Sequence, residues 1–173
     1  MKIGGLNMYK IGEFVVYGND GVCEVEDISK LDIQGVNQKK NYYTLKPMHE
    51  NGKIFAPTDT NVFMRPVVTH EEIEKIIRQI PSIEETEYDT KNMRLLQEYY
   101  KQLFKNYKCI DLLTIIVNLN DKKIDLEKKG KRLGQVEEKY LKSAKNLLEN
   151  EFSIVLGIPK EEVEEYIKDK IKQ

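Results

Sequence analysis

Hydrophobic and polar residues alternate in short runs over the first seventy positions of the chain, a pattern typical of β-strands. The stretch FVVYGNDGVCEVEDI (14–28) holds two such runs on either side of residues 18–21, where two glycines favour a turn. Three further runs follow at 41–47, 54–57 and 61–66. Five short strands joined by short turns predict a small SH3/Tudor-like β barrel, or a curled sheet, over residues 1–68, with 1–7 as a candidate disordered leader.

The pattern becomes helical after residue 68. Thr69 and Glu72 have the spacing of a capping box, and the helix that follows carries isoleucines on one face until Pro81 ends it. Further helical patterns begin near residue 89 or 90 and cover a mostly buried segment at 109–119 and a long amphipathic segment at 136–157. A last helix starts at Pro159 and is expected to cap the bundle, with a role in a dimer as the alternative. Residues 69–173 are thus predicted to form an all-α bundle of four or five helices, so the fold class is α+β with two domains.

The composition is that of a folded, soluble chain. Of 173 residues, 40% are hydrophobic and 33% are charged, and no apolar run approaches the roughly 18 residues of a membrane span. The N-terminus lacks the continuous apolar segment of a secretory signal. We therefore expect a cytoplasmic protein.

Few residues offer catalytic chemistry. The two histidines, His49 and His70, fall beside a turn and at a helix start, and the two cysteines, Cys23 and Cys109, lie far apart. The carboxylates alternate with lysines, as on solvated helix faces, and no motif for nucleotide, metal or nucleophilic chemistry is present. The sequence therefore predicts a binding protein that is not an enzyme and needs no metal or cofactor.

Positive charge is concentrated in one block, although the net charge of the chain is only −1. Residues 90–148 hold fourteen basic and seven acidic side chains, a net charge of +7. The densest part, KKIDLEKKGKRL (122–133), is either a solvated stretch or a mobile basic arm that contacts phosphate. Because lysines outnumber arginines, the block suits non-specific backbone contact better than base recognition. The candidate DNA-binding cations are Lys91, Arg94, Lys122, Lys123, Lys128, Lys129, Lys131, Arg132, Lys139, Lys142 and Lys145.

Two other features can contact partners. Tyr88, at the head of the second predicted helix, is a candidate wedge against DNA bases, with an ordinary surface tyrosine as the alternative. A small barrel also has edge strands whose free backbone groups can pair with a partner strand. The stretch Ser29-Lys30-Leu31-Asp32-Ile33 is the candidate edge, with an ordinary strand or hairpin as the alternative.

Several of these segments together resemble a known family. YKIGEFVVYGNDGVCEVEDI (9–28), YYTL (42–45), the Ala56-Pro57 step and MRPV (64–67) are similar to the amino-terminal module of the CarD/CdnL transcription regulators, which also occurs in the transcription-repair coupling factor. EEKYLKSAKNLLENEFSIVLG (137–157) resembles the last helix of the CarD core. The resemblance extends in the right order from about Tyr9 to Gly157.

The resemblance implies a non-enzymatic bacterial regulator with two contacts. Its Tudor-like domain is expected to dock on the RNA polymerase β subunit, and its helical domain to contact promoter DNA at the upstream edge of the transcription bubble, changing the stability of the open complex. The candidate polymerase contacts are Ser29, Lys30, Leu31, Asp32, Ile54 and Phe55.

The chain departs from the family pattern at both contacts. Family members commonly place a tryptophan at the head of the second helix, whereas this chain has none and aligns Tyr88 or Asp89 there. Leu31 and Phe55 stand where some relatives carry arginines.

Two other functions are compatible with the residue pattern. The first is a protein-protein adaptor that uses a Tudor-like domain and makes no DNA contact, with the lysines merely solvated. The second, an RNA-binding factor, is less favoured because no stacking aromatics lie among the basic residues.

Overall fold

The computed structural model describes residues 9–83 and 92–172. The chain divides into two compact units, Met1–Val67 and Val68–Gln173, so the division lies within one residue of the predicted boundary. Among the described residues, no helix is both long enough and apolar enough to cross a membrane.

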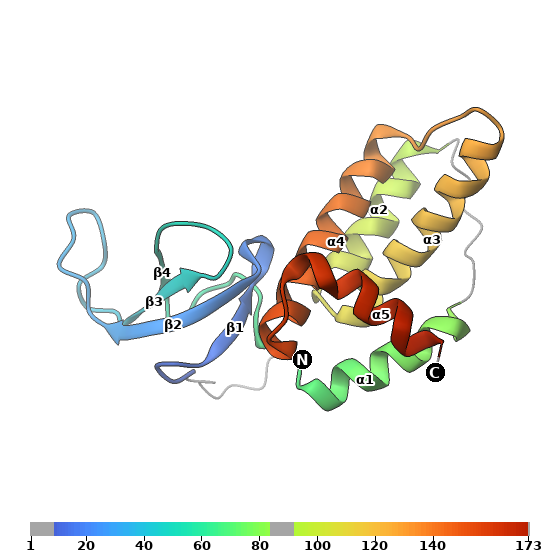
Figure 1. Ribbon diagram of the computed structural model, residues 1–173. Helices are drawn as coiled ribbons and strands as arrows, with labels where there is room; N and C mark the ends of the chain where they lie inside the picture. Colours follow the sequence, from blue (N-terminus) through green and yellow to red (C-terminus); the bar gives the residue numbers. More distant parts are fainter. Residues whose placement is uncertain (1–8, 84–91, 173) are drawn as a thin grey trace. The chain divides into compact units, whose positions relative to one another are not determined.

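The first unit is a five-stranded antiparallel sheet with the strand order β4-β3-β2-β1-β5 (Figure 1). A short 3-10 turn, η1 (Gly18–Asp20), joins the first two strands. Side chains alternate between the two faces, so every second residue enters the core, which includes Val15, Cys23, Val25, Tyr43, Leu45 and Ala56. The strands are β1 (Phe14–Tyr17), β2 (Val22–Ser29), β3 (Tyr42–Pro47), β4 (Ile54–Pro57) and β5 (Met64–Pro66).

The sheet is open, so the predicted barrel is not closed. β4 and β5 lie at opposite edges, and no strand pairing joins them within residues 9–83. Both edge strands are short and end in proline, Pro57 and Pro66, which have no N–H group to donate to a further ladder. The pairing of β2 with β3 is also irregular between Val25 and Asp27, a kind of feature that bends a strand.

The second unit is helical, as predicted. Its first helix starts at the expected capping box: Thr69 Oγ1 accepts the Glu72 N–H at 3.2 Å, and the Glu72 carboxylate accepts the Thr69 N–H at 2.7 Å. Short 3-10 turns, η2 (Ile80–Ser82) and η3 (Lys160–Glu162), follow the first helix and precede the last. The helices are α1 (His70–Gln79), α2 (Met93–Phe104), α3 (Cys109–Lys128), α4 (Gln135–Leu156) and α5 (Val163–Ile171).

Two helix boundaries differ from the prediction. α2 begins at Met93, later than expected, because the Asn92 side chain caps it by accepting the Leu95 N–H. α3 continues to Lys128, nine residues beyond the predicted apolar segment. Most of the basic run is therefore helical, and only residues 129–134 form a loop, so the expected basic arm is largely part of α3.

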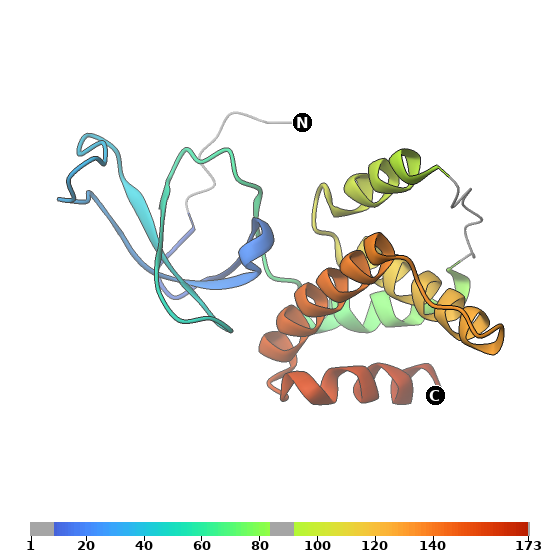
Figure 2. The ribbon, with the colours of Figure 1, turned by 90° about the horizontal axis from the view of Figure 1, so that it is seen from above.

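α1 and α5 lie side by side and cross the antiparallel pair α3 and α4 (Figures 1 and 2). The Tyr166 hydroxyl of α5 donates a hydrogen bond to Glu74 of α1 at 2.6 Å, and Lys170 pairs with the same carboxylate at 3.1 Å. Val163, at the start of α5, is fully buried in the core of the unit. α5 thus occupies the position that the capping prediction requires.

A buried carboxylate holds the start of the second unit. Glu151 of α4 is 2% exposed and accepts hydrogen bonds from the Val68 N–H at 2.9 Å and the Cys109 thiol at 3.3 Å. Val68, two residues before α1, and Cys109, the first residue of α3, are therefore bound to the same side chain of α4.

Candidate functional site

Phe55 lies on the edge strand β4 and points to the outer face of the sheet. Cross-strand pairing places it beside Thr44 of β3, which pairs in turn with Asp27 of β2. The Phe55 side chain is 45% exposed, although most large hydrophobic residues of this unit are buried or half-buried. An exposed aromatic on an edge strand is a feature of protein-binding surfaces.

The remaining candidate polymerase contacts divide between a loop and the core. Ser29 is the last residue of β2, and Lys30, Leu31 and Asp32 enter the loop to β3, so 30–33 is not the predicted edge strand. The actual edges are β4 and β5, because β2 lies inside the sheet between β1 and β3. Ile54 lies in register with Leu45 and Val25 and packs half-buried against the core of the sheet, so its role as a contact stays a prediction.

A shallow hollow on the outer face adjoins Phe55, and the sequence did not single out its other members. Ile11 is 62% exposed at one side of the hollow, and Lys53 pairs with Glu26 at 2.7 Å at another. Ile11 lies beside β2 because the N–H of Gly12, which precedes β1, donates to the Val25 carbonyl at 2.8 Å. Alternation within strands could not reveal this contact.

The candidate DNA-binding cations differ in whether they form ion pairs with carboxylates of the chain. Lys122 binds the Glu137 carboxylate at 2.5 Å and is only 32% exposed, and Lys145 binds Glu164 of α5 at 3.5 Å. Both therefore connect helices, and their assignment to DNA binding stays a prediction. Neither pair was visible in the sequence, because the partners lie fifteen and nineteen residues away.

Two further cations form exposed pairs within their own helices. Arg94, on the first turn of α2, binds Glu98 at 3.2 Å, and Lys128 binds Asp125 at 3.0 Å. Such solvent-exposed pairs are weak, so a phosphate can replace the carboxylate at little energetic cost. Tyr88 and Lys91 lie outside the described residues.

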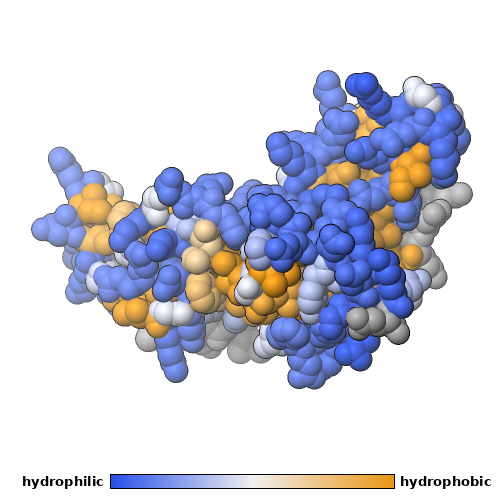
Figure 3. All heavy atoms as spheres, in the orientation of Figure 1, coloured by the Kyte–Doolittle hydropathy of each residue, from blue (hydrophilic) through white to orange (hydrophobic). Residues whose placement is uncertain are grey.

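Four cations around the α3–α4 connection remain available. We call Lys123, Lys129, Lys131 and Arg132 the α3–α4 basic tip; all are exposed, and none pairs with a carboxylate among residues 9–83 and 92–172. Gly130 has a φ of +66° and turns the chain at this point. The surface here is mostly hydrophilic (Figure 3). Lys139 and Lys142 add exposed charge on the first half of α4.

The tip and the start of α2 lie at the same end of the helical unit but are separated across its width (Figures 1 and 2). Arg94, in the first turn of α2, therefore lies at the same end of the helical unit as the tip but is not part of the same cluster of cations. The predicted basic block therefore forms one dense group of cations, the α3–α4 basic tip, and more widely spaced cations on α2 and α4.

Comparison with known proteins concerns the first unit. Residues 9–68 match the model of the CarD-like/TRCF RID domain family. A search of curated proteins found no significant match to the chain. The match ends before α1, so the similarity of α4 to the CarD core helix stays a prediction. Residues 9–68 of this chain, which include all five strands of the sheet, thus form a CarD-like RNA polymerase-interacting domain.

Proposed function

We propose that this protein is a CarD-like transcription regulator that binds the RNA polymerase β subunit through its sheet unit and promoter DNA through its helical unit. The observation that carries the proposal is the combination of an RNA polymerase-interacting domain with four unpaired cations at one helical corner. The activity is binding rather than catalysis.

The polymerase contact is assigned to the outer face around Phe55. Phe55 and Ile11 supply exposed apolar area, and Glu26 and Asp27 line the same hollow. An apolar centre with a charged margin is the usual composition of a protein-protein interface. With Phe55 and Leu31 in place of arginines, we expect this contact to depend more on apolar burial than on ion pairs.

The DNA contact is assigned to the α3–α4 basic tip. Its four cations lie within ten residues on a helix end and a short loop, so they can follow a phosphate backbone without reading base edges. Lys122 and Lys145 form the ion pairs between helices, and the four cations of the tip take no part in these two pairs.

The regulatory effect follows from differential binding. If the tip binds the DNA geometry of the open complex better than closed duplex, the equilibrium moves toward the open complex by that difference in free energy. The polymerase contact raises the local concentration of the helical unit at the promoter, so a weak DNA contact suffices.

The test uses the full chain with RNA polymerase and a forked promoter fragment. The slope of log affinity against log salt is measured for the natural chain and for the quadruple variant K123A/K129A/K131A/R132A. Each lost phosphate contact lowers the magnitude of the slope by about 0.7 to 0.9, so we expect a decrease of about 3.

A matched control removes the same charge elsewhere in the helical unit. The variant K75A/R78A/K168A/K172A acts on exposed residues of α1 and the C-terminal end of α5, and should keep the natural slope. Equal slopes for all three proteins, with polymerase binding intact, would refute the DNA contact and favour the adaptor function.

A further inference from the structure

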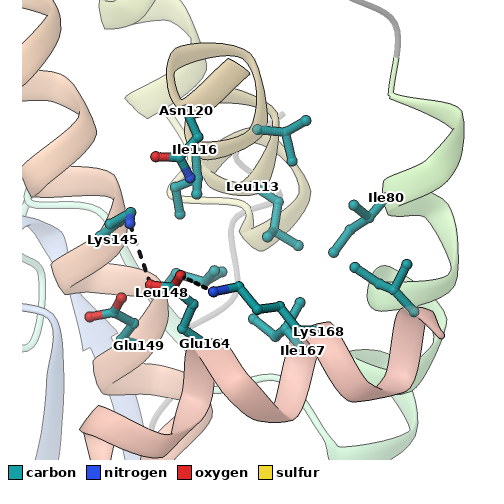
Figure 4. Close-up of a pocket in the computed structure, with 12 residues that line it drawn as sticks. Ile80, Leu113, Ile116, Asn120, Lys145, Leu148, Glu149, Glu164, Ile167 and Lys168 are labelled. Atoms are coloured by element: carbon teal, nitrogen blue, oxygen red, sulfur yellow. Dashed lines mark hydrogen bonds and ion pairs between the residues drawn. The ribbon is translucent and has the colours of Figure 1, made fainter. Parts of the chain in front are cut away.

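An apolar pocket opens in the helical unit where α3 and α5 face each other (Figure 4). α5 packs against α1 and α4, and its remaining side carries Ile167 and Ile171. α3 presents Leu113, Ile116 and Val117 to the same space. Two aliphatic helix faces thus border a gap instead of filling it with their own side chains.

The pocket has a buried floor and half-exposed walls. Leu113 and Leu148 form the floor and are 2% and 1% exposed, whereas Ile171 at the edge is 41% exposed. Ile80 approaches from the end of α1, opposite α4 (Figure 4). The volume is about 160 Å³. Aliphatic walls beside an unfilled space lose dispersion contacts that an apolar occupant would restore.

The rim is polar but electrically balanced. Glu164 binds both Lys145, at 3.5 Å, and Lys168, at 2.6 Å, in a chain across one side of the opening. Glu149 adds a second carboxylate, and burial raises its pKa. Asn120 supplies an uncharged amide. Two cations and two carboxylates therefore line the rim.

We propose that this pocket binds a neutral, mainly apolar small molecule with a single six-membered ring or a branched chain of similar size. The volume decides the size class, because an aliphatic cavity of about 150 Å³ in another protein holds one benzene molecule. A peptide helix needs a longer groove than this. The balanced rim decides the charge class, because its two lysines offset its two carboxylates, so a charged ligand would lose hydration and meet little net opposite charge. This site is independent of the proposed DNA and polymerase contacts.

The test is a titration of the full chain with benzyl alcohol, followed by methyl NMR of labelled isoleucine, leucine and valine. The methyl signals of Ile116, Val117 and Ile167 should shift in a saturable manner with one dissociation constant. Ile124, which is 50% exposed on the same helix outside the pocket, should shift little and serves as the internal control. Absence of saturable shifts at the pocket methyls, or equal shifts at Ile124, would overturn the proposal.

Two filling variants and one matched control test the location. V117F places a larger side chain in the pocket and reduces its volume. I171W covers the opening of the pocket from an exposed position, where the substitution should leave folding intact. Each should raise the dissociation constant at least about tenfold, whereas I124W should leave it within about twofold. An unchanged constant in both filling variants would show that the ligand binds elsewhere.

Benzoate and benzylammonium test the charge class, because they keep the ring and add a negative or positive charge. Both should bind at least about fivefold more weakly than benzyl alcohol. Tighter binding of either ion would overturn the assignment of a neutral ligand.

Discussion

Lys122 and Glu137 form an ion pair that joins the last turns of α3 to the first turn of α4. The Lys122 Nζ lies 2.5 Å from Glu137 Oε1, and the Glu137 side chain is 7% exposed. Its second carboxylate oxygen accepts the Gly134 N–H at 3.1 Å. The first lysine of the basic run therefore stabilises the α3–α4 connection on which the basic tip is displayed.

Replacing Lys122 by alanine should destabilise the helical unit. The change leaves the buried Glu137 carboxylate without its cation, and we expect the free energy of unfolding to fall by about 2 kcal/mol, less than for a fully buried pair because Lys122 is partly exposed. Urea denaturation followed by far-UV circular dichroism measures the change. K123A, one residue along, should stay within about 0.5 kcal/mol of the natural chain. Equal losses in the two variants would show that the pair has no structural role.

Replacing Glu151 should weaken the attachment of residue 68 to α4. E151A removes the acceptor of the Val68 N–H and leaves a cavity at a 2% exposed site, so we expect a loss of about 2–4 kcal/mol. E151Q keeps an acceptor oxygen and should lose less. Chemical denaturation gives both values, and E138A, at an exposed position of the same helix, is the control. If E151Q lost as much as E151A, the hydrogen bond to Val68 would not be the cause.

The contact between α1 and α5 should make stability depend on acid pH. The hydrogen bond from Tyr166, and next that from Lys170, lower the pKa of Glu74 from its usual 4.5. A lowered pKa contributes stability that is present above pH 4.5 and lost as the pH falls below it. E74Q should therefore reduce the decline in thermal midpoint on the acid side. A decline as steep as that of the natural chain would contradict the assignment.

The same contact should also respond at alkaline pH. Burial, followed by the hydrogen bond to Glu74, raises the pKa of Tyr166 from 10 to about 12. The folded state therefore favours the protonated phenol, and this contribution is lost as the pH rises from 10 to about 12. Y166F should remove part of the alkaline decline in thermal midpoint. An unchanged decline would show that other groups cause it.

Phe55 should contribute to RNA polymerase binding more than to folding. F55A should lower the affinity for RNA polymerase about tenfold, because exposed aromatics are frequent hot spots, while changing stability by no more than about 1 kcal/mol. The affinity is measured by surface plasmon resonance with the polymerase immobilised. V62A, at a position 44% exposed outside β4, is matched in exposure and should bind normally. A loss in V62A but not in F55A would place the contact elsewhere on the sheet unit.

Most helices and strands could be predicted from local sequence patterns. The Thr69–Glu72 capping box could be predicted because both partners lie within one helical turn, and the five strands because their alternation is local. Residues 9–28 carried the family resemblance for the same reason: the spacing of turn glycines and strand residues is a property of the chain itself. The end of α3 was missed because polar residues leave no apolar period to mark a helix.

Tertiary structure decided which of these residues remain available to a partner. Lys122 and Lys123 are equivalent in the sequence, yet only Lys122 meets a buried carboxylate, because α4 returns antiparallel to α3 and places Glu137 opposite it. The open sheet, the outward position of Phe55 and the pocket between α3 and α5 likewise depend on how separate elements approach one another. The sequence by itself determined the elements and the charge that they carry. Packing between elements distant in the chain determined which charges are paired and which apolar faces stay uncovered, because those energies depend on distances that no local pattern encodes.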